Sequence, residues 1–133
     1  MNISEAAKRT GLTSKMIRDY EQAGLIEPAK RSESGYRQYS EADLVTLYFI
    51  KHAREVDFSL PQIKVLLSLK NDANRNSADV KQLVGEHMIT LQNKIERLQS
   101  MNDTLQSWYL SCKGNQHSAC PIIDRLSEIF VSR

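Results

Sequence analysis

The residues of this 133-residue chain with the clearest chemical potential are its two cysteines, Cys112 and Cys120. Seven residues separate them, so both thiolates can converge on one ion while the intervening loop wraps around it. Two soft ligands without a third partner favour a monovalent d¹⁰ ion, and softness selects Cu(I) among biological metals. Tetrahedral Zn²⁺ would need two more ligands, of which His117 could supply one. A reversible disulfide between the two cysteines is a further alternative.

No catalytic set accompanies the cysteines. The sequence contains no Gly-rich phosphate loop, no nucleophile elbow and no His-Glu-x-x-His motif. Its three histidines, His52, His87 and His117, are scattered along the chain. An enzyme is therefore the least favoured class of function.

The composition is that of an ordinary globular protein, with 41% hydrophobic and 26% charged residues. No stretch approaches the roughly 18 apolar residues that a membrane span needs, and the first residues lack the pattern of a signal peptide. We therefore expect a cytoplasmic protein with no membrane partner. In a reducing cytoplasm, two cysteines close in sequence indicate a metal site or a redox switch rather than a structural disulfide.

Positive charge is concentrated near the start of the chain. Residues 1–40 carry seven Lys and Arg against five acidic residues, whereas residues 41–133 carry eleven of each sign. The net charge of +2 therefore lies in the first forty residues. A polyanionic partner is expected to bind there.

The same region has the pattern of a small DNA-binding domain. A helix from Asn2 to Thr10 is expected to stop at Gly11, and a second helix capped by Thr13 or Ser14 is expected to end at Gly24. Two short helices joined by a turn containing glycine are typical of a helix-turn-helix. Residues 28–39 have no helical period and are expected to form a strand-turn-strand wing.

Two more helices should complete a DNA-binding domain over residues 1–70. Ser40 and Asp43 match a capping box that opens a helix towards Val56. The next helix is expected to start at Leu60-Pro61, since proline is tolerated in a first turn.

A long amphipathic helix is expected after a polar linker at residues 71–77. Apolar residues recur every seven positions over residues 78–111, which is typical of a coiled coil. A helix of about 34 residues is roughly 50 Å long and cannot cover its own stripe. We expect a homodimer, the alternative being a helix that lies on its own domain. The predicted dimerisation residues are Val84, Met88, Leu91, Ile95, Leu98 and Leu105.

Residues 112–133 are expected to form the metal-binding loop and a short C-terminal helix. Ile122, Ile123, Leu126, Ile129 and Phe130 share one face of that helix. A helix this short is marginal alone, so we expect it to dock on the preceding long helix.

Several N-terminal motifs together resemble the MerR family of transcription regulators. They are Ile17-Arg18-Asp19-Tyr20-Glu21, Gly24-Leu25-Ile26, Arg31, and Gly35-Tyr36-Arg37 with Tyr39. The resemblance implies a mainly α fold: a winged helix-turn-helix dimer with an antiparallel coiled coil and a C-terminal effector site. One departure is Asp19, because the family usually has an aromatic residue there.

The resemblance gives the basic and tyrosine side chains of this region a role in DNA binding. Those of the second helix would reach the major groove or its phosphates, and those of the wing would reach phosphates or a minor groove. The alternative is that they are solvated charges and core tyrosines. The predicted DNA-binding residues are Lys15, Arg18, Tyr20, Arg31, Tyr36 and Arg37.

Within the family, the cysteine loop is similar to that of the copper-efflux (CueR-like) regulators and their silver- and gold-responsive relatives. Their Cys-x₇-Cys loop ends in Cys-Pro-Ile, as Cys120-Pro121-Ile122 does here. Ser77 matches a serine that these regulators carry where zinc and mercury sensors have cysteine; its alternative role is a helix cap. Lys81 would offset the negative charge of two thiolates and a monovalent ion, or is simply solvated. Lys113 departs from the small residue or proline usual in such loops.

The function implied by the resemblance is metal-responsive activation of transcription. The dimer would bind promoter DNA with an overlong spacer and, on binding Cu(I), or else Ag(I) or Au(I), would distort the DNA so that RNA polymerase engages. The alternatives are a thiol-disulfide redox regulator, a Zn(II)-responsive member of the family, and a small-molecule-responsive member in which the cysteines are incidental.

Overall fold

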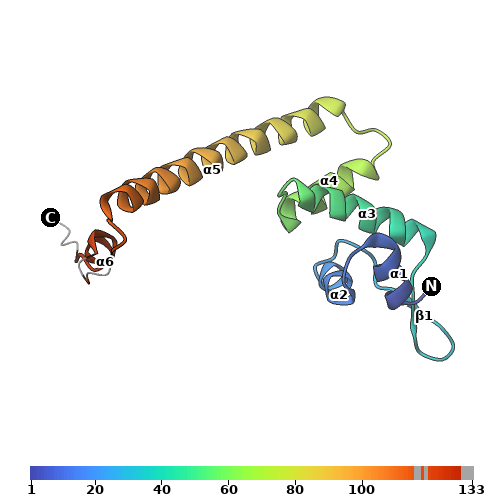
Figure 1. The fold of residues 1–133 in the computed structure, drawn as a ribbon. Helices are drawn as coiled ribbons and strands as arrows, with labels where there is room; N and C mark the ends of the chain where they lie inside the picture. Colours follow the sequence, from blue (N-terminus) through green and yellow to red (C-terminus); the bar gives the residue numbers. More distant parts are fainter. Residues whose placement is uncertain (116–117, 119, 130–133) are drawn as a thin grey trace. The chain divides into compact units, whose positions relative to one another are not determined.

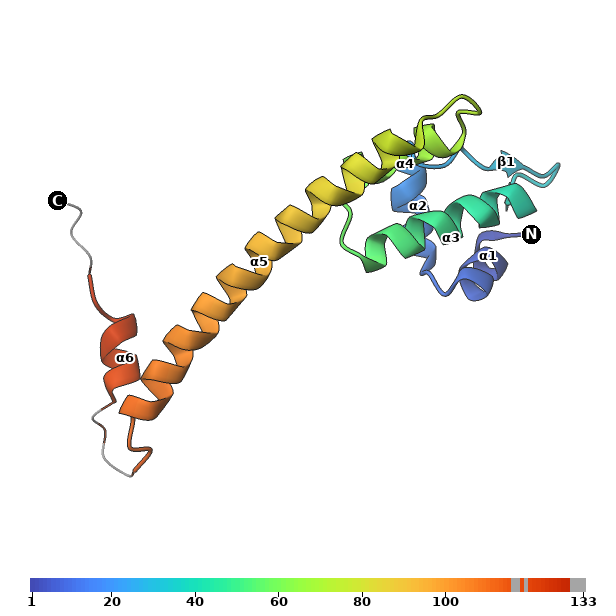
Figure 2. The same cartoon turned by 90° about the horizontal axis from the view of Figure 1, so that it is seen from above.

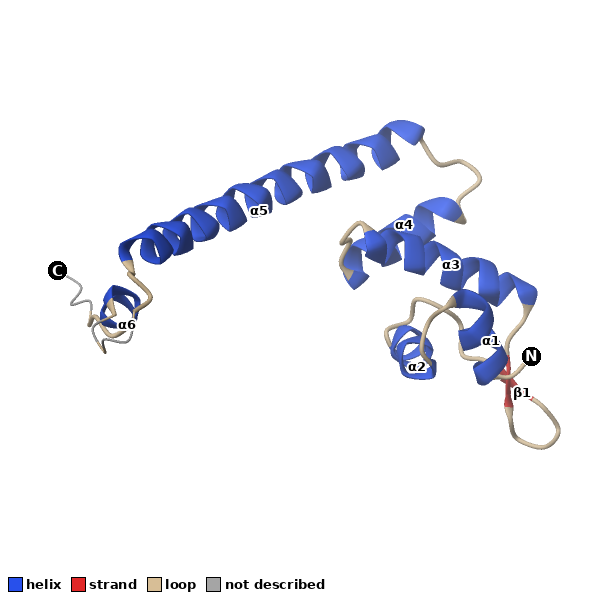
Figure 3. Cartoon of the chain, viewed as in Figure 1, coloured by secondary structure: helices blue, strands red, loops and turns tan. Residues whose placement is uncertain are grey.

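The computed structural model describes residues 1–115, 118 and 120–129, and this part of the chain is mainly helical, as expected (Figures 1 and 3). The elements are α1 (Ile3–Thr10), α2 (Ser14–Gln22), β1 (Lys30–Arg31), β2 (Arg37–Gln38), α3 (Glu41–Glu55), α4 (Leu60–Lys70), α5 (Ser77–Ser111) and α6 (Pro121–Leu126). The chain divides into two compact units, Met1–Leu83 and Val84–Arg133, which are described separately. No helix among the described residues is long and apolar enough to cross a membrane.

Helices α1 and α2 form the expected helix-turn-helix. The side chain of Asn2 caps α1 by accepting from the Glu5 backbone N–H at 2.9 Å, and Gly11 ends the helix with a φ of 75°. That left-handed conformation favours glycine. Thr13 caps α2 by accepting from the Met16 backbone N–H at 3.0 Å. Local capping chemistry therefore sets the turn between the two helices.

Strands β1 and β2 form the expected wing. They pair antiparallel with Lys30 opposite Gln38 and Arg31 opposite Arg37. At the tip, Gly35 has a φ of 84°, and its backbone N–H donates to the Ser32 carbonyl at 2.9 Å. The wing is short because only two residues of each strand pair.

The core of the first unit fixes α2 against α3 and α4. Ile17, Leu47, Ile50 and Ile63 have no exposed surface. Each such aliphatic side chain contributes about 1.5–3 kcal/mol when it is fully buried. Both following helices begin as expected, because Ser40 and Asp43 form a capping box and Ser59 forms a second one with Gln62.

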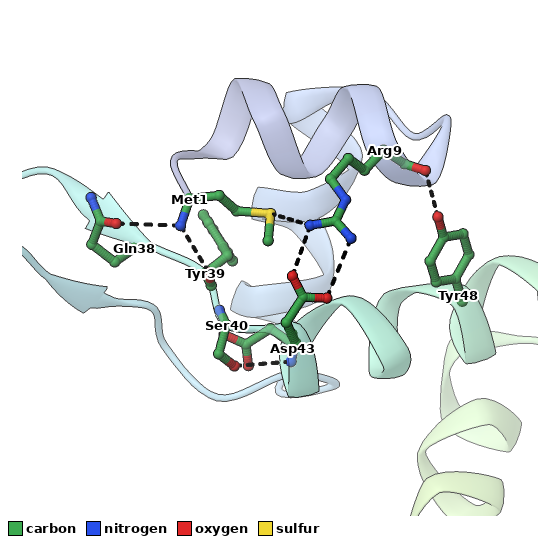
Figure 4. A network of polar contacts seen from close by, with 8 residues as sticks. Met1, Arg9, Gln38, Tyr39, Ser40, Asp43 and Tyr48 are labelled. Carbon is green, nitrogen blue, oxygen red and sulfur yellow. Dashed lines mark hydrogen bonds and ion pairs between the residues drawn. The ribbon is translucent and has the colours of Figure 1, made fainter.

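Polar contacts join the ends of α1 to α3 and to the wing (Figure 4). Tyr48 on α3 donates to the Arg9 carbonyl, and the Arg9 guanidinium makes two bonds to Glu41, at 2.8 and 3.3 Å. Arg9 lowers the pKa of the Glu41 carboxyl, but this pair is solvent-exposed and stabilises the fold little. The Met1 carbonyl accepts from the Tyr39 backbone N–H at 2.7 Å, which joins the first residue to the end of β2.

Helix α5 is one continuous element of 35 residues (Figure 2). Asn76 caps it, because its side-chain oxygen accepts from the Ala78 N–H at 2.9 Å and its carbonyl accepts from the Asp79 N–H at 3.0 Å. The alternative role of Ser77 as the cap is therefore wrong, since Ser77 is already the first helical residue. The helix starts one residue earlier than the expected linker boundary.

The apolar stripe of α5 is largely open in the single chain. Leu91 is half-buried, and the other predicted dimerisation residues are exposed. Their exposed fractions are 41% for Val84, 64% for Met88, 57% for Ile95, 61% for Leu98 and 57% for Leu105. A stripe of this length on a water-exposed helix needs a covering surface.

Helix α6 does not bury its apolar residues on α5. Ile122 is half-buried, whereas Ile123, Leu126 and Ile129 are exposed, and Phe130 lies outside the described residues. The expected docking of this segment on the preceding helix is therefore wrong for the single chain. With only six residues, α6 presents too little surface to close over the stripe.

Candidate DNA-binding surface and metal site

A basic depression lies between α2 and the wing. It has a volume of about 350 Å³. The residues that line it are Asn2, Ile3, Arg18, Arg31, Gly35, Tyr36 and Arg37. Four of the six predicted DNA-binding residues therefore come together, although 19 positions separate the first of them from the last. Three guanidinium groups around one depression form a surface suited to phosphate oxygens.

The outer surface of α2 carries Lys15 and Asp19. The Lys15 ammonium lies 3.2 Å from the Asp19 carboxylate, one helical turn away, and the two side chains are 84% and 50% exposed. An exposed pair of this kind contributes only about 0.3–0.5 kcal/mol. Lys15 can therefore leave Asp19 for a phosphate at little cost. Asp19, where the family usually has an aromatic residue, therefore places an acid beside Lys15 and outside the basic depression.

The wing holds the other predicted contacts. The Arg31 guanidinium donates to the Gly35 carbonyl at 3.0 Å, which fixes Arg31 along the wing. Tyr36 at the tip is 70% exposed, so its ring and hydroxyl are accessible to a ligand. Arg31 thus supplies a fixed cation, and Tyr36 supplies an open aromatic side chain.

Tyr20 lies in the core and not on this surface. It is 5% exposed and packs among the buried residues of the first unit. The predicted phosphate contact of Tyr20 is not supported, and the alternative of a core tyrosine describes it better. The sequence indicates this burial, because Tyr20 follows Ile17 by three residues and lies on the same face of α2.

Arg37 is held by Glu21, a residue to which the sequence analysis assigned no role. The Arg37 guanidinium donates to Glu21 Oε2 at 2.8 Å, and the side chains are 37% and 9% exposed. Glu21 Oε1 accepts from the Ala29 backbone N–H at 2.6 Å, and Oε2 also accepts from the Tyr39 hydroxyl at 3.4 Å. Burial raises the pKa of Tyr39, so its hydroxyl stays protonated and can donate. In the sequence, this role of Glu21 is indicated by its position four residues after Ile17, on the buried face of α2.

The two cysteines meet beyond the C-terminal end of α5. Their Sγ atoms lie 3.9 Å apart, and both thiols are free and half-buried. A disulfide requires about 2.05 Å, so the sulfurs are not bonded. At a metal–thiolate bond length of about 2.3 Å, two sulfurs lie about 3.8 Å apart in a tetrahedral site and about 4.6 Å apart in a linear one. One ion can bridge them after a small movement in either geometry.

The local electrostatics favour the thiolate of Cys120, which directly precedes α6. The backbone N–H group of Ile123, together with that of Ile122 and the Cys112 thiol, lowers the pKa of the Cys120 thiol, while burial and, to a smaller degree, the negative charge of Asp124 oppose this effect. A thiolate, and not a thiol, is the form that binds a metal ion. The site therefore favours the metal-binding form of Cys120 beside a second sulfur.

The other predicted members of the metal site lie in the first unit or outside the described residues. Residues 1–115, 118 and 120–129 contain no group of three or more His, Cys, Asp or Glu side chains able to hold a metal ion. His117 lies outside the described residues. Ser77 and Lys81 lie at the N-terminal end of α5, and Cys112 follows its C-terminal end.

Comparison with known proteins agrees with this architecture. Residues 1–70 match the family described as MerR HTH family regulatory protein, and residues 44–108 match the family described as MerR, DNA binding. A probable heavy metal-dependent transcriptional regulator of Haemophilus influenzae is 53% identical over 127 residues, which cover 96% of this chain and 99% of that protein. The regulator CueR of Salmonella typhi is 48% identical over 127 residues, covering 96% of this chain and 92% of that one.

A solved structure is similar over nearly the whole chain. The transcription regulator PbrR691 from Ralstonia metallidurans CH34, in complex with lead(II), superposes with a TM-score of 0.81 at 30% identity, covering 96% of this chain and 99% of that one. Both the sequence matches and the fold therefore lead to one assignment. The chain belongs to the MerR family of helix-turn-helix transcriptional regulators, which bind DNA and are not enzymes.

Proposed function

We propose that this regulator senses Cu(I), or its heavier congeners Ag(I) and Au(I), through Cys112 and Cys120. The observation that carries the proposal is the pair of half-buried thiols 3.9 Å apart, with one pKa lowered. Two soft sulfur donors suit a monovalent d¹⁰ ion, which accepts two-coordination. The names of the heavy metal-dependent and CueR relatives support the same class of effector.

We also propose that the active form is a homodimer with antiparallel α5 helices. The exposed stripe needs a partner, and a second copy of the same stripe is self-complementary under twofold symmetry. In an antiparallel pair, the N-terminal end of one α5 lies beside the cysteine loop of the other. The partner subunit's Ser77 and Lys81 would then lie near the sulfurs, where the lysine offsets the single negative charge of two thiolates and a monovalent ion.

The proposed output is a change in promoter DNA. Each first unit carries one basic depression, so a dimer offers two of them to a pseudo-palindromic site. Helix α5 and its cysteine loop would switch between two states. Metal binding favours the state in which the DNA is bent or untwisted. Bringing the two promoter elements that flank an overlong spacer into register would allow RNA polymerase to engage.

Zinc is the second candidate effector, because the sulfur separation is close to that of a tetrahedral site. X-ray absorption of the anaerobically loaded dimer tests the choice. Two sulfur neighbours without nitrogen or oxygen support the monovalent ion. A four-coordinate site with nitrogen or oxygen ligands would replace Cu(I) by Zn(II). A disulfide without bound metal, found by thiol titration, would favour the redox alternative.

Arg18→Ala should weaken DNA binding with and without metal, because Arg18 lines the basic depression. Each lost phosphate contact should reduce the slope of log K against log salt by about 0.9. The measurement is a salt titration by fluorescence anisotropy, using a duplex selected by the wild-type protein from a random library. Lys70→Ala is the control, since Lys70 ends α4 and does not line the depression. Equal slopes for both variants would contradict the proposed contact.

Ser77→Cys should broaden the response towards divalent ions, because it supplies a third thiolate beside the loop of the opposite subunit. Transcription assays with Zn(II) and Cu(I) measure the change. Ser68→Cys is the control, since Ser68 is an exposed serine on α4. A divalent response in the control, or none with Ser77→Cys, would argue against the antiparallel arrangement.

A further inference from the structure

The Glu21 carboxylate occupies a position that simple electrostatics disfavours. It is bonded to Arg37, which lines the basic depression, so its negative charge there repels the phosphates of DNA. Its side chain is only 9% exposed, and burying a carboxylate is costly unless the charge is paired and hydrogen-bonded. Glu21 is paired with Arg37 and accepts from Ala29 and Tyr39, so its contacts account for the burial. They do not by themselves account for an acid beside a phosphate-binding surface.

The contacts of Glu21 join three segments that must be aligned for DNA binding. Glu21 itself lies on α2, Ala29 lies on the chain that leads into the wing, and Arg37 lies on β2. The first of these segments also carries Arg18. One carboxylate therefore sets the distance between the helix expected in the major groove and the wing beside it.

We propose that Glu21 is a positioning residue for DNA binding, which holds the Arg37 guanidinium and the wing in the arrangement that faces DNA together with Arg18. This rests on the proposed contact between Arg37 and DNA. A guanidinium has five N–H donors, and the bond to Glu21 uses one nitrogen, Nη1. Arg37 remains 37% exposed, so its other donors are accessible to a phosphate. Because the side chain is already fixed, it loses little conformational freedom when DNA binds.

Glu21→Gln separates this role from bulk electrostatics because the two effects have opposite signs. The substitution removes one negative charge, so electrostatics alone predicts tighter DNA binding. The amide has a single acceptor oxygen, and its NH₂ group would face either the Ala29 N–H or the Arg37 guanidinium. We therefore expect binding to the selected duplex to weaken by roughly tenfold to a hundredfold, the range for losing a hydrogen bond to a charged group.

Glu41→Gln is the matched control. Glu41 also accepts from an arginine, Arg9, at 2.8 Å, but that pair is exposed and does not line the depression. Both substitutions change the net charge equally. The control should bind the duplex as tightly as the wild type or slightly more tightly. Equal weakening by the two glutamines would overturn the proposal.

A double-mutant cycle with Arg37→Gln shows whether Glu21 acts through Arg37. If it does, Glu21→Gln and Arg37→Gln each weaken binding and lower the salt slope, and the double variant binds no more weakly than Arg37→Gln alone. Additive losses would overturn the positioning role while leaving the DNA contact in place. Unchanged binding by Arg37→Gln would instead refute the proposed contact, and the role of Glu21 would fall with it.

Arg37→Lys tests the same geometry without removing a charge. The variant keeps an ion pair with Glu21, so folding is expected, but an ammonium lacks the planar fork that can bind a carboxylate and a phosphate together. We expect duplex binding to weaken although the net charge is unchanged, while thermal unfolding of the full chain stays close to that of the wild type. Wild-type affinity for Arg37→Lys would overturn the proposal even if Glu21→Gln failed to fold.

Discussion

Replacing either Cys112 or Cys120 by serine should abolish the transcriptional response to Cu(I) and leave DNA binding by the metal-free protein largely intact. A hydroxyl cannot replace a thiolate on a soft cation, and the loss of one sulfur leaves the site with a single soft donor. The cysteines lie beyond α5, in a different unit from the basic depression, so the DNA-binding surface keeps its structure. In vitro transcription with RNA polymerase under anaerobic, buffered Cu(I) measures the response.

Lys113→Ala is the control for the cysteine variants. It changes an exposed residue of the same loop without removing a sulfur, so activation should persist. A full response in either serine variant would show that the cysteines are not the ligands. Work under reducing conditions also separates the metal from the redox alternative, because a regulator that needs a disulfide would show no response there.

Leu98→Glu should convert the proposed dimer into a monomer. Leu98 belongs to the stripe of α5 and is 61% exposed in the single chain, so it becomes buried only when a partner covers it. Burying a carboxylate costs several kcal/mol, and twofold symmetry introduces two of them. We expect the dimer dissociation constant to rise by more than about a thousandfold. Sedimentation equilibrium over a range of concentrations measures it, and Leu91→Glu should behave alike.

Ser100→Glu is the matched control on α5. It adds the same charge two residues further along, on the side of the helix away from the stripe, and it should remain dimeric. A wild-type protein that sediments as a monomer would refute the coiled-coil interpretation. A Leu98→Glu variant that is as dimeric as the control would also refute that interpretation.

The helix-turn-helix and wing could be predicted because their signals are local. Thr13 and Ser40 each accept from a backbone N–H three residues ahead, so their capping roles follow from short stretches of sequence, whereas Asn2, expected as the first helical residue, caps α1 instead. Gly11 and Gly35 mark turns by their positive φ angles. The start of α5 was missed by one residue because Asn76 and Ser77 are both good caps, and only the folded backbone distinguishes them.

The contacts that cross the first unit could not be predicted in the same way. Glu21 bonds Ala29, Arg37 and Tyr39, which lie 8 to 18 positions away, so its role depends on how the wing folds back on α2. Tyr20 shows the reverse error, since a motif suggested a phosphate contact where packing buries the ring. The cysteine spacing predicted a shared site, but only the structure supplies the 3.9 Å separation.

The open stripe of α5 also affects the steady-state level of this regulator in a cell. A chain whose stripe is closed only by a second copy gains stability by mass action, so its resistance to unfolding rises with its own concentration. Unpaired chains present a row of apolar side chains, from Val84 to Leu105, to chaperones and proteases. Newly made chains at low abundance would be removed quickly and paired chains slowly. In the proposed dimer, the interface would thereby set the concentration below which chains are lost, independent of any metal.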